Sequence, residues 1–259
     1  MIKKTAILFL ITIALAGCKT QIAHLQQDPS FTYEAVTQHQ LVVGGVVSMV
    51  DPEQSVLERV RLGEMLSRAF KAERGELQLI SSGYLLKKLG SQDLAILQDS
   101  YQFTGTVEPS DVEHIRQLIP DARFLILCRI ESNHISQDHQ KTETPVADSA
   151  EDEKKGEYEH LRVEVTLTTS REVSASLLIY DLELQRQVWS GFLKQTKSNK
   201  NSSSNTIDND QNWVEQIVGS MFEAMINQDD MSYPEAPSVD RVLEGIFEGF
   251  AENMPERRR

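Results

Sequence analysis

Apolar residues in the first half of the chain recur at two spacings, which predict strands alternating with helices. QLVVGGVVSMV, residues 40–50, is apolar and β-branched, as expected of a buried strand, and its two glycines let another backbone approach closely. Over residues 62–70 apolar side chains return every three or four positions, which predicts a helix that ends near Gly75. ELQLISS predicts a short strand, GYLLKKL, SQDLAILQDSY and SDVEHIRQLI three short helices, and ARFLILCRIE a central strand that is apolar on both faces.

The second half begins with strict alternation. Apolar residues occupy odd positions over residues 161–167 and again over residues 173–179, which indicates a half-buried antiparallel strand that forms a hairpin with QVWSGFLKQT across DLELQR. A helical period returns over residues 214–225 and over residues 239–250. The order predicts an α/β fold with a single mixed β-sheet of about five strands, covered by helices, with a parallel βαβ unit first and antiparallel hairpins later.

Composition sets the domain boundaries. Residues 39–228 form the predicted α/β domain, interrupted by an acidic loop at about 134–159 and a Ser/Asn/Lys-rich loop at about 197–212. Residues 18–38 are polar, rich in Gln and without a sustained period, which predicts a flexible tether. Residues 229–259 comprise a linker with Pro234 and Pro237 and a carboxy-terminal amphipathic helix.

The first 17 residues have the layout of an export signal. Lys3 and Lys4 precede an apolar run of about eleven residues, too short for the roughly twenty that span a bilayer as a helix. Leu15, Ala16, Gly17 and Cys18 resemble a bacterial lipobox, which implies cleavage before Cys18, diacylglycerol on its thiol and an acyl chain on its new amine. The alternative is an ordinary secretory signal that contains a cysteine.

The residue after the cysteine sorts such lipoproteins. Aspartate usually retains them in the inner membrane of Gram-negative bacteria, whereas Lys19 stands here. The resemblance therefore implies an outer-membrane, periplasm-facing lipoprotein, provided that the host is Gram-negative.

Charge and cysteine count narrow the function classes. The formal net charge of −13 becomes more negative once the leader with its two lysines is removed, and no cationic stripe is present to bind nucleic acid. Cys128, in an apolar run, is expected to be a buried core residue. A reactive thiol or an intermolecular disulfide is the alternative.

Two segments carry a resemblance to a family. DARFLILCRI and YDLELQRQVWSG, together with the order of elements over residues 39–228, resemble the periplasmic lipoproteins that share the fold of the TolB amino-terminal domain, a group that includes the curli secretion lipoprotein CsgG and the penicillin-binding-protein activator LpoB. The letters depart from the family pattern, because Cys128 and Arg129 stand near its usual glycine and Glu183, Leu184 and Gln185 replace its Thr-Gly turn.

This resemblance implies one of two functions. The first is a non-catalytic accessory or assembly factor that binds envelope proteins, such as a cell-wall synthase or a secretion complex. The second is a subunit of an oligomeric CsgG-like secretion or surface-assembly pore, hence a homo-oligomer. The stretches that correspond to the membrane hairpins of the pore are the two polar loops, which lack alternating apolar residues, so the accessory function is favoured.

Catalytic and metal-binding motifs are not found in the sequence. It contains no Walker loop, G-x-S-x-G, S-x-x-K, H-E-x-x-H or C-x-x-C. His134, Asp138, His139 and His160 are the nearest approach to a metal cluster, but a flexible acidic loop does not fix the geometry that zinc requires. We therefore expect no enzyme, metal or cofactor, with an unrecognised envelope hydrolase as the third alternative.

The final helix offers a candidate binding surface. Val242, Ile246 and Phe250 lie on its apolar stripe, and its other face carries glutamates that anionic lipid would repel. The stripe either packs on its own domain or binds a partner protein or a second copy of the chain. Trp189 and Trp213 fall in apolar periodic segments and are expected in the core.

Overall fold

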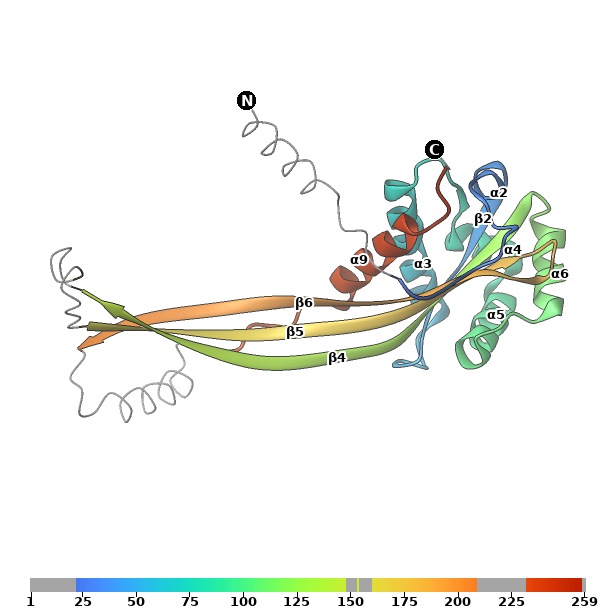
Figure 1. Ribbon diagram of the computed structural model, residues 1–259. Coiled ribbons are helices and arrows are strands. Elements are labelled where there is room, and N and C mark those ends of the chain that lie inside the picture. The colour runs from blue at the N-terminus through green and yellow to red at the C-terminus, as the bar shows by residue number, and fades with distance from the viewer. Residues whose placement is uncertain (1–21, 148–152, 154–159, 209–231, 258–259) are drawn as a thin grey trace, which may run out of the picture. The chain divides into compact units, whose positions relative to one another are not determined.

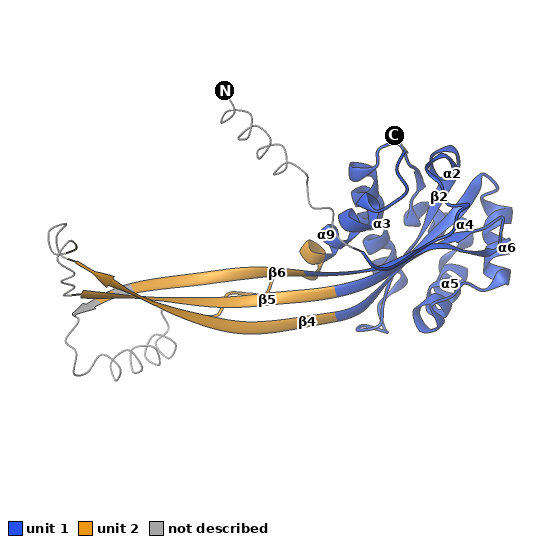
Figure 2. Ribbon diagram, viewed as in Figure 1, with its two compact units in different colours: residues 1–132, 174–195, 243–259 blue, residues 133–173, 196–242 orange. Residues whose placement is uncertain are grey.

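The computed structural model describes residues 22–147, 153, 160–208 and 232–257 (Figure 1). The chain divides into two compact units, which Figure 2 distinguishes by colour. Unit 1 takes residues 1–132, 174–195 and 243–259, and unit 2 takes residues 133–173 and 196–242. Three strands contribute to both units: β4 (Ala122–Val146), β5 (His160–Asp181) and β6 (Arg186–Asp208).

A mixed sheet of six strands forms the centre of the fold, in the order β1-β6-β5-β4-β2-β3. β2 (Gln40–Ser48) pairs in parallel with both β3 (Gln78–Ile80) and β4, while β1 (Ala23–Gln27) pairs antiparallel with β6. The predicted α/β class with a single mixed sheet covered by helices is confirmed.

The helices begin where the sequence supplies caps. α3 (Val56–Glu73) and α4 (Ser82–Leu89) follow Ser55 and Ser81, whose hydroxyl groups accept hydrogen bonds from first-turn amides. α5 (Ser91–Thr104) begins after Gly90 and ends at Gly105, which adopts the left-handed conformation. α6 (Pro109–Leu118) has proline at its first position, and α9 (Val239–Glu252) lies near the carboxyl end.

One face of the sheet packs against α4, α5 and α6. Its core combines residues of β2, β4 and β5 with residues of those helices, of α3 and of the connecting segments: Val42, Val47, Val60, Leu85, Leu94, Leu97, Tyr101, Val107, Val112, Ile115, Ile119, Ala122, Leu125, Leu127, Leu178 and Leu182. Because side chains alternate along a strand, Phe124 points to the opposite face, where its ring meets Phe31 edge-on at 5.3 Å. The central strand is therefore buried on both sides, as predicted.

The α9 stripe packs within the chain. Val242, Ile246 and Phe250 are buried, and within unit 1 the Phe250 ring meets Trp189 edge-on at 6.2 Å. Trp189 is in the core, as expected, while Trp213 lies outside the described residues. In this structure the chain itself covers the stripe.

The tether is shorter than the predicted 18–38. Residues 23–27 form β1, and α2 (Tyr33–Gln38) follows, capped by Thr32. All five side chains of β1 are exposed, and the strand pairs through its backbone at the edge of the sheet. Because none of its side chains is buried, its sequence shows no apolar period. Between the two elements, Phe31 is fully buried and anchors the segment.

Unit 2 corrects both predicted loops. Residues 134–146 continue β4 and residues 197–208 continue β6, on either side of β5. The middle strand alone carries the apolar row, with Leu161, Val163, Val165 and Leu167 buried. Hydroxyl pairs join β5 to β6, as in Thr166 with Ser202 and Ser170 with Ser198, both at 2.8 Å. Polar outer strands pair through backbone and hydroxyl groups, and for that reason their composition resembles that of a loop.

The segment before α9 is attached to unit 2 by hydrogen bonds. Asn199 donates its side-chain amide to the carbonyl of Glu235 at 2.8 Å, and Arg171 donates Nε to the carbonyl of Pro237 at 2.6 Å. The predicted helix over residues 214–225 lies outside the described residues. Within the described part of the chain, no helix combines the length and apolarity needed to cross a membrane.

We expect Ile246→Asp to lower the free energy of unfolding by about 3 kcal/mol or more, because it buries a carboxylate without a partner. Ile246 is 1% exposed. Urea unfolding measures the change. Glu248→Asp, at an exposed position of the same helix, is the matched control and should stay within about 0.5 kcal/mol of the wild type. Equal stability of the two variants would contradict the burial of the stripe.

Candidate functional site

The outward face of α5 carries two large apolar side chains. Ile96 is 54% exposed and Phe103 is 66% exposed. They are seven residues apart, so they lie on the same side of the helix with a separation of about 10.5 Å along its axis. The inward face of the same helix is filled by Leu94, Leu97 and Tyr101. Ile96 and Phe103 therefore do not belong to the hydrophobic core.

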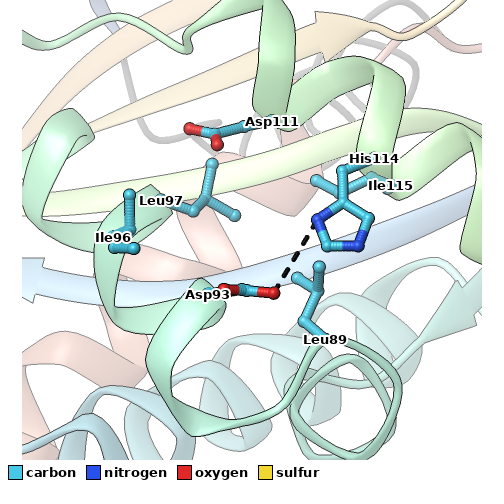
Figure 3. Close-up of a pocket in the computed structure, with 7 residues that line it drawn as sticks. All are labelled: Leu89, Asp93, Ile96, Leu97, Asp111, His114 and Ile115. Carbon is cyan, nitrogen blue, oxygen red and sulfur yellow. Dashed lines mark ion pairs between the residues drawn. The ribbon is translucent and has the colours of Figure 1, made fainter.

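A pocket opens beside Ile96, between α5 and α6. Its lining residues are Leu89, Asp93, Ile96, Leu97, Asp111, His114 and Ile115 (Figure 3). Leu97 and Ile115 are buried and form an apolar base, whereas the side chains of Asp93 and His114 are about half exposed. The pocket thus joins an apolar interior to a polar rim. We call it, together with Ile96 and Phe103, the α5 face.

The two carboxylates of the pocket occupy equivalent positions. Asp93 is the third residue of α5 and Asp111 is the third residue of α6. The first turn of a helix presents unpaired amide groups and a positive dipole end, which favour a negative side chain there. Because both helices begin at the pocket, both carboxylates come to its rim.

Burial opposes the charge on Asp111. Desolvation raises the pKa of this carboxyl above its ordinary value, and the charges of Glu108 and Asp93 act in the same direction, while His114 acts against them. Oδ2 of Asp111 is shielded from solvent and has no hydrogen-bond partner. Asp93 lies near His114, and the distance from Nδ1 of His114 to Oδ2 of Asp93 is 3.9 Å (Figure 3).

The lining of the pocket has the chemistry of a binding site. None of the seven lining residues is a serine, cysteine, threonine or lysine that could act as a nucleophile. An apolar base with an anionic rim instead complements a group that is part apolar and part cationic.

A second hollow lies between β1, α2 and the carboxyl end, lined by Gln27, Asp28, Pro29, Thr32, Tyr33, Glu34, Asn253, Met254, Pro255 and Glu256. Several of its polar groups already have partners within the chain. Hydrogen bonds from Ser30 lower the pKa of Asp28, which also pairs with Arg186 at 2.9 Å. Arg74 donates to the carbonyls of Met254 and Pro255 at 3.2 and 2.8 Å. We regard it as a structural contact.

The residues singled out from the sequence lie elsewhere. Leu15, Ala16, Gly17, Cys18 and Lys19 fall outside the described residues. Cys128 is fully buried, as expected, and burial raises the pKa of its thiol far above the ordinary value.

The three histidines singled out from the sequence lie on strands. His134 and His139 are exposed on β4, and His160 begins β5. The described residues contain no group of three or more His, Cys, Asp or Glu side chains placed to hold a metal ion.

The α5 face was missed at the sequence level, although part of its signal was available. In SQDLAILQDSYQFT the residues Leu94, Leu97 and Tyr101 repeat at three and four, which leaves Ile96 and Phe103 out of phase. The pocket itself had no such signal, because its lining comes from three helices, α4, α5 and α6. Their relative placement is set by packing on the sheet.

Comparisons with known proteins show weak likenesses. No protein-family model matches the chain, and no curated protein sequence matches it significantly. Among solved structures, the LpoB C-terminal domain from Salmonella enterica matches at 11% identity and a TM-score of 0.33, covering 63% of this chain and 87% of its own. Lipoprotein GNA1162 from Neisseria meningitidis matches at 13% identity and 0.28, covering 73% and 96%.

A PelC dodecamer from Paraburkholderia phytofirmans matches at 11% identity and a TM-score of 0.31, covering 68% of this chain and 80% of its own. At such scores the likeness carries no argument about function.

The raised pKa of Asp111 predicts a pH dependence of stability. The folded protein holds this proton more tightly than the unfolded chain, so the contribution of Asp111 to stability is complete below its ordinary pKa of 3.8 and is lost as pH rises through the folded value. Asp111→Asn cannot ionise. Its free energy of unfolding, relative to the wild type, should therefore rise across this window and be constant above it.

Urea unfolding between about pH 3 and pH 7 measures this difference. Glu113→Gln is the control, since Glu113 belongs to the same helix but pairs at the surface with Arg116 and has only the weak effect of an exposed ion pair. A difference between Asp111→Asn and the wild type that does not vary with pH would contradict the burial of this carboxylate.

Proposed function

We propose that the protein is an exported envelope lipoprotein, anchored by lipid on Cys18, that acts as a non-catalytic accessory or assembly factor by binding another envelope protein. The α5 face is its binding surface. The anchor holds the protein on the periplasmic side of the outer membrane. It has no cofactor beyond the diacylglycerol and acyl chain on Cys18, and nucleic acid is not a partner.

The exposed pair on α5 is the observation that carries this proposal. Burying an Ile or Phe side chain is favourable by about 1.5–3 kcal/mol of free energy. The protein does not gain this free energy while Ile96 and Phe103 face water. Aromatic side chains beside a pocket are also typical of the residues that dominate the energy of protein interfaces. A protein partner that covers both side chains and enters the pocket recovers that energy.

The lipobox supports the anchor. Three acyl chains bury many more methylene groups than a single myristoyl chain, which by itself binds membranes only reversibly. We therefore expect the partner protein that binds the α5 face to lie near the same membrane.

Cys18→Ala should abolish incorporation of labelled palmitate and release the processed protein from the membrane fraction. Labelling in growing cells, followed by fractionation, measures both effects. Lys19→Asp keeps the acceptor thiol and serves as the control, with labelling retained and the inner membrane as the expected fraction in a Gram-negative host. Palmitate on the Cys18→Ala protein would contradict the anchor.

A photo-crosslinking amino acid at position 103 should yield an adduct of defined mass in intact cells. Ile96→Ser in the same protein should lower its yield several-fold, because the partner loses an apolar contact. Tyr84→Ser is the matched control, since Tyr84 is 45% exposed on α4 outside the pocket and its replacement should not change the yield. No adduct at position 103, from a protein with normal melting behaviour, would overturn the proposal.

A pore subunit is the second candidate. The resemblance places the pore hairpins at two stretches that we predicted to be loops, and the structure has strands in both, β4 to Val146 and β6 to Asp208. Size-exclusion chromatography of the detergent-solubilised lipoprotein separates the candidates. A large ring favours the pore, and a monomer or dimer favours the accessory factor.

A further inference from the structure

The geometry points to an arginine side chain of the partner protein as the occupant of the pocket between α5 and α6. Its guanidinium lies between the carboxylates of Asp93 and Asp111, and its aliphatic stem lies on Leu97 and Ile115. This inference rests on the proposed function and names the chemistry that the α5 face recognises.

The pocket offers an unpaired acceptor to a hydrogen-bond donor that carries positive charge. Oδ2 of Asp111 is shielded from water without a partner, and a buried acceptor left unpaired is unfavourable. The nearby charges on Glu108 and Asp93 are negative, and the one opposing neighbour, His114, is positioned toward Asp93. A cationic group of the partner protein would supply both the hydrogen bond to Asp111 and the positive charge.

An arginine fits this pocket better than a lysine or a metal ion. The guanidinium presents five donors in one plane and can bond two carboxylates at once, whereas the lysine ammonium is a compact, strongly hydrated charge. Among the described residues no three His, Cys, Asp or Glu side chains are placed to hold a metal ion, and the apolar base formed by Leu97 and Ile115 adds no ligand. The same base suits the three methylene groups of an arginine.

The surroundings point to an arginine within a polypeptide. Ile96 lines the pocket, and Phe103 follows it after about 10.5 Å on the same side of α5. An arginine flanked by apolar residues would cover all three positions together, and arginine is one of the residue types that dominate interface energies. The net charge of −13 also favours the approach of a cationic segment.

The test uses N-acetyl-arginine-amide, which imitates an arginine inside a chain. The full-length lipoprotein in nanodiscs is labelled at its isoleucine methyl groups, because Ile96 and Ile115 line the pocket while Ile126 and Ile246 lie in the core and report on the fold. We expect saturable shifts of the Ile96 and Ile115 methyl signals. The blocked citrulline amide, similar in shape but neutral, should produce none, and the blocked lysine should bind more weakly.

Asp111→Asn should weaken the binding of the arginine probe by about tenfold, corresponding to about 1.4 kcal/mol. Asp93→Asn tests the opposite side of the pocket and should weaken it as well. Glu113→Gln removes a carboxylate from the same helix outside the pocket and should leave binding unchanged. Unchanged Ile126 and Ile246 signals show that each variant is folded.

The inference is overturned by no shift with the arginine probe, by equal shifts with citrulline, or by unchanged affinity in both aspartate variants. Free arginine is compared to separate a small-molecule ligand from a polypeptide, and tenfold tighter binding than the blocked form also overturns it. The crosslink at position 103 reports on the proposed function separately. An adduct there without a response to arginine removes the pocket assignment alone, whereas its absence removes the proposed function.

Discussion

The close contact between β2 and α3 is the constraint on which unit 1 depends. Gly45 has a φ of +122°, and a Cβ there would lie 2.5 Å from Nε2 of Gln98. A Cβ on Gly63 of α3 would lie 3.0 Å from the Cα of Gly45. Two positions without side chains thus let a helix rest directly on the central parallel strand.

This contact also orients α5. Gln98 is fully buried and donates its amide to the carbonyl of Gly44 at 2.8 Å, which fixes the inward side of the helix. Ile96 and Phe103 must then point outward, and the first turn of α5 is held beside the first turn of α6. The orientation of the α5 face therefore depends on the packing of Gln98 against Gly44 and Gly45 of β2, some fifty residues earlier in the chain.

Sequence patterns predicted the elements whose side chains alternate or repeat. β2, the central part of β4 and the α9 stripe each carry a strong apolar period, and each is found where expected. β1 and the outer strands of unit 2 were missed because backbone pairing holds them and their side chains are exposed or polar. The pocket could not be predicted, because Asp93 and Asp111 meet only through the packing of two helices on one sheet.

Cys128 has a practical consequence for probing this protein. Its thiol is fully buried in β4, and burial keeps it protonated. If Cys18 is acylated, no accessible thiol remains in the mature chain, whose two cysteines are thereby both accounted for. A cysteine introduced at the surface can then be coupled to a fluorescent dye or spin label without first altering the native sequence, which makes the lipoprotein ready for distance measurements on its own membrane.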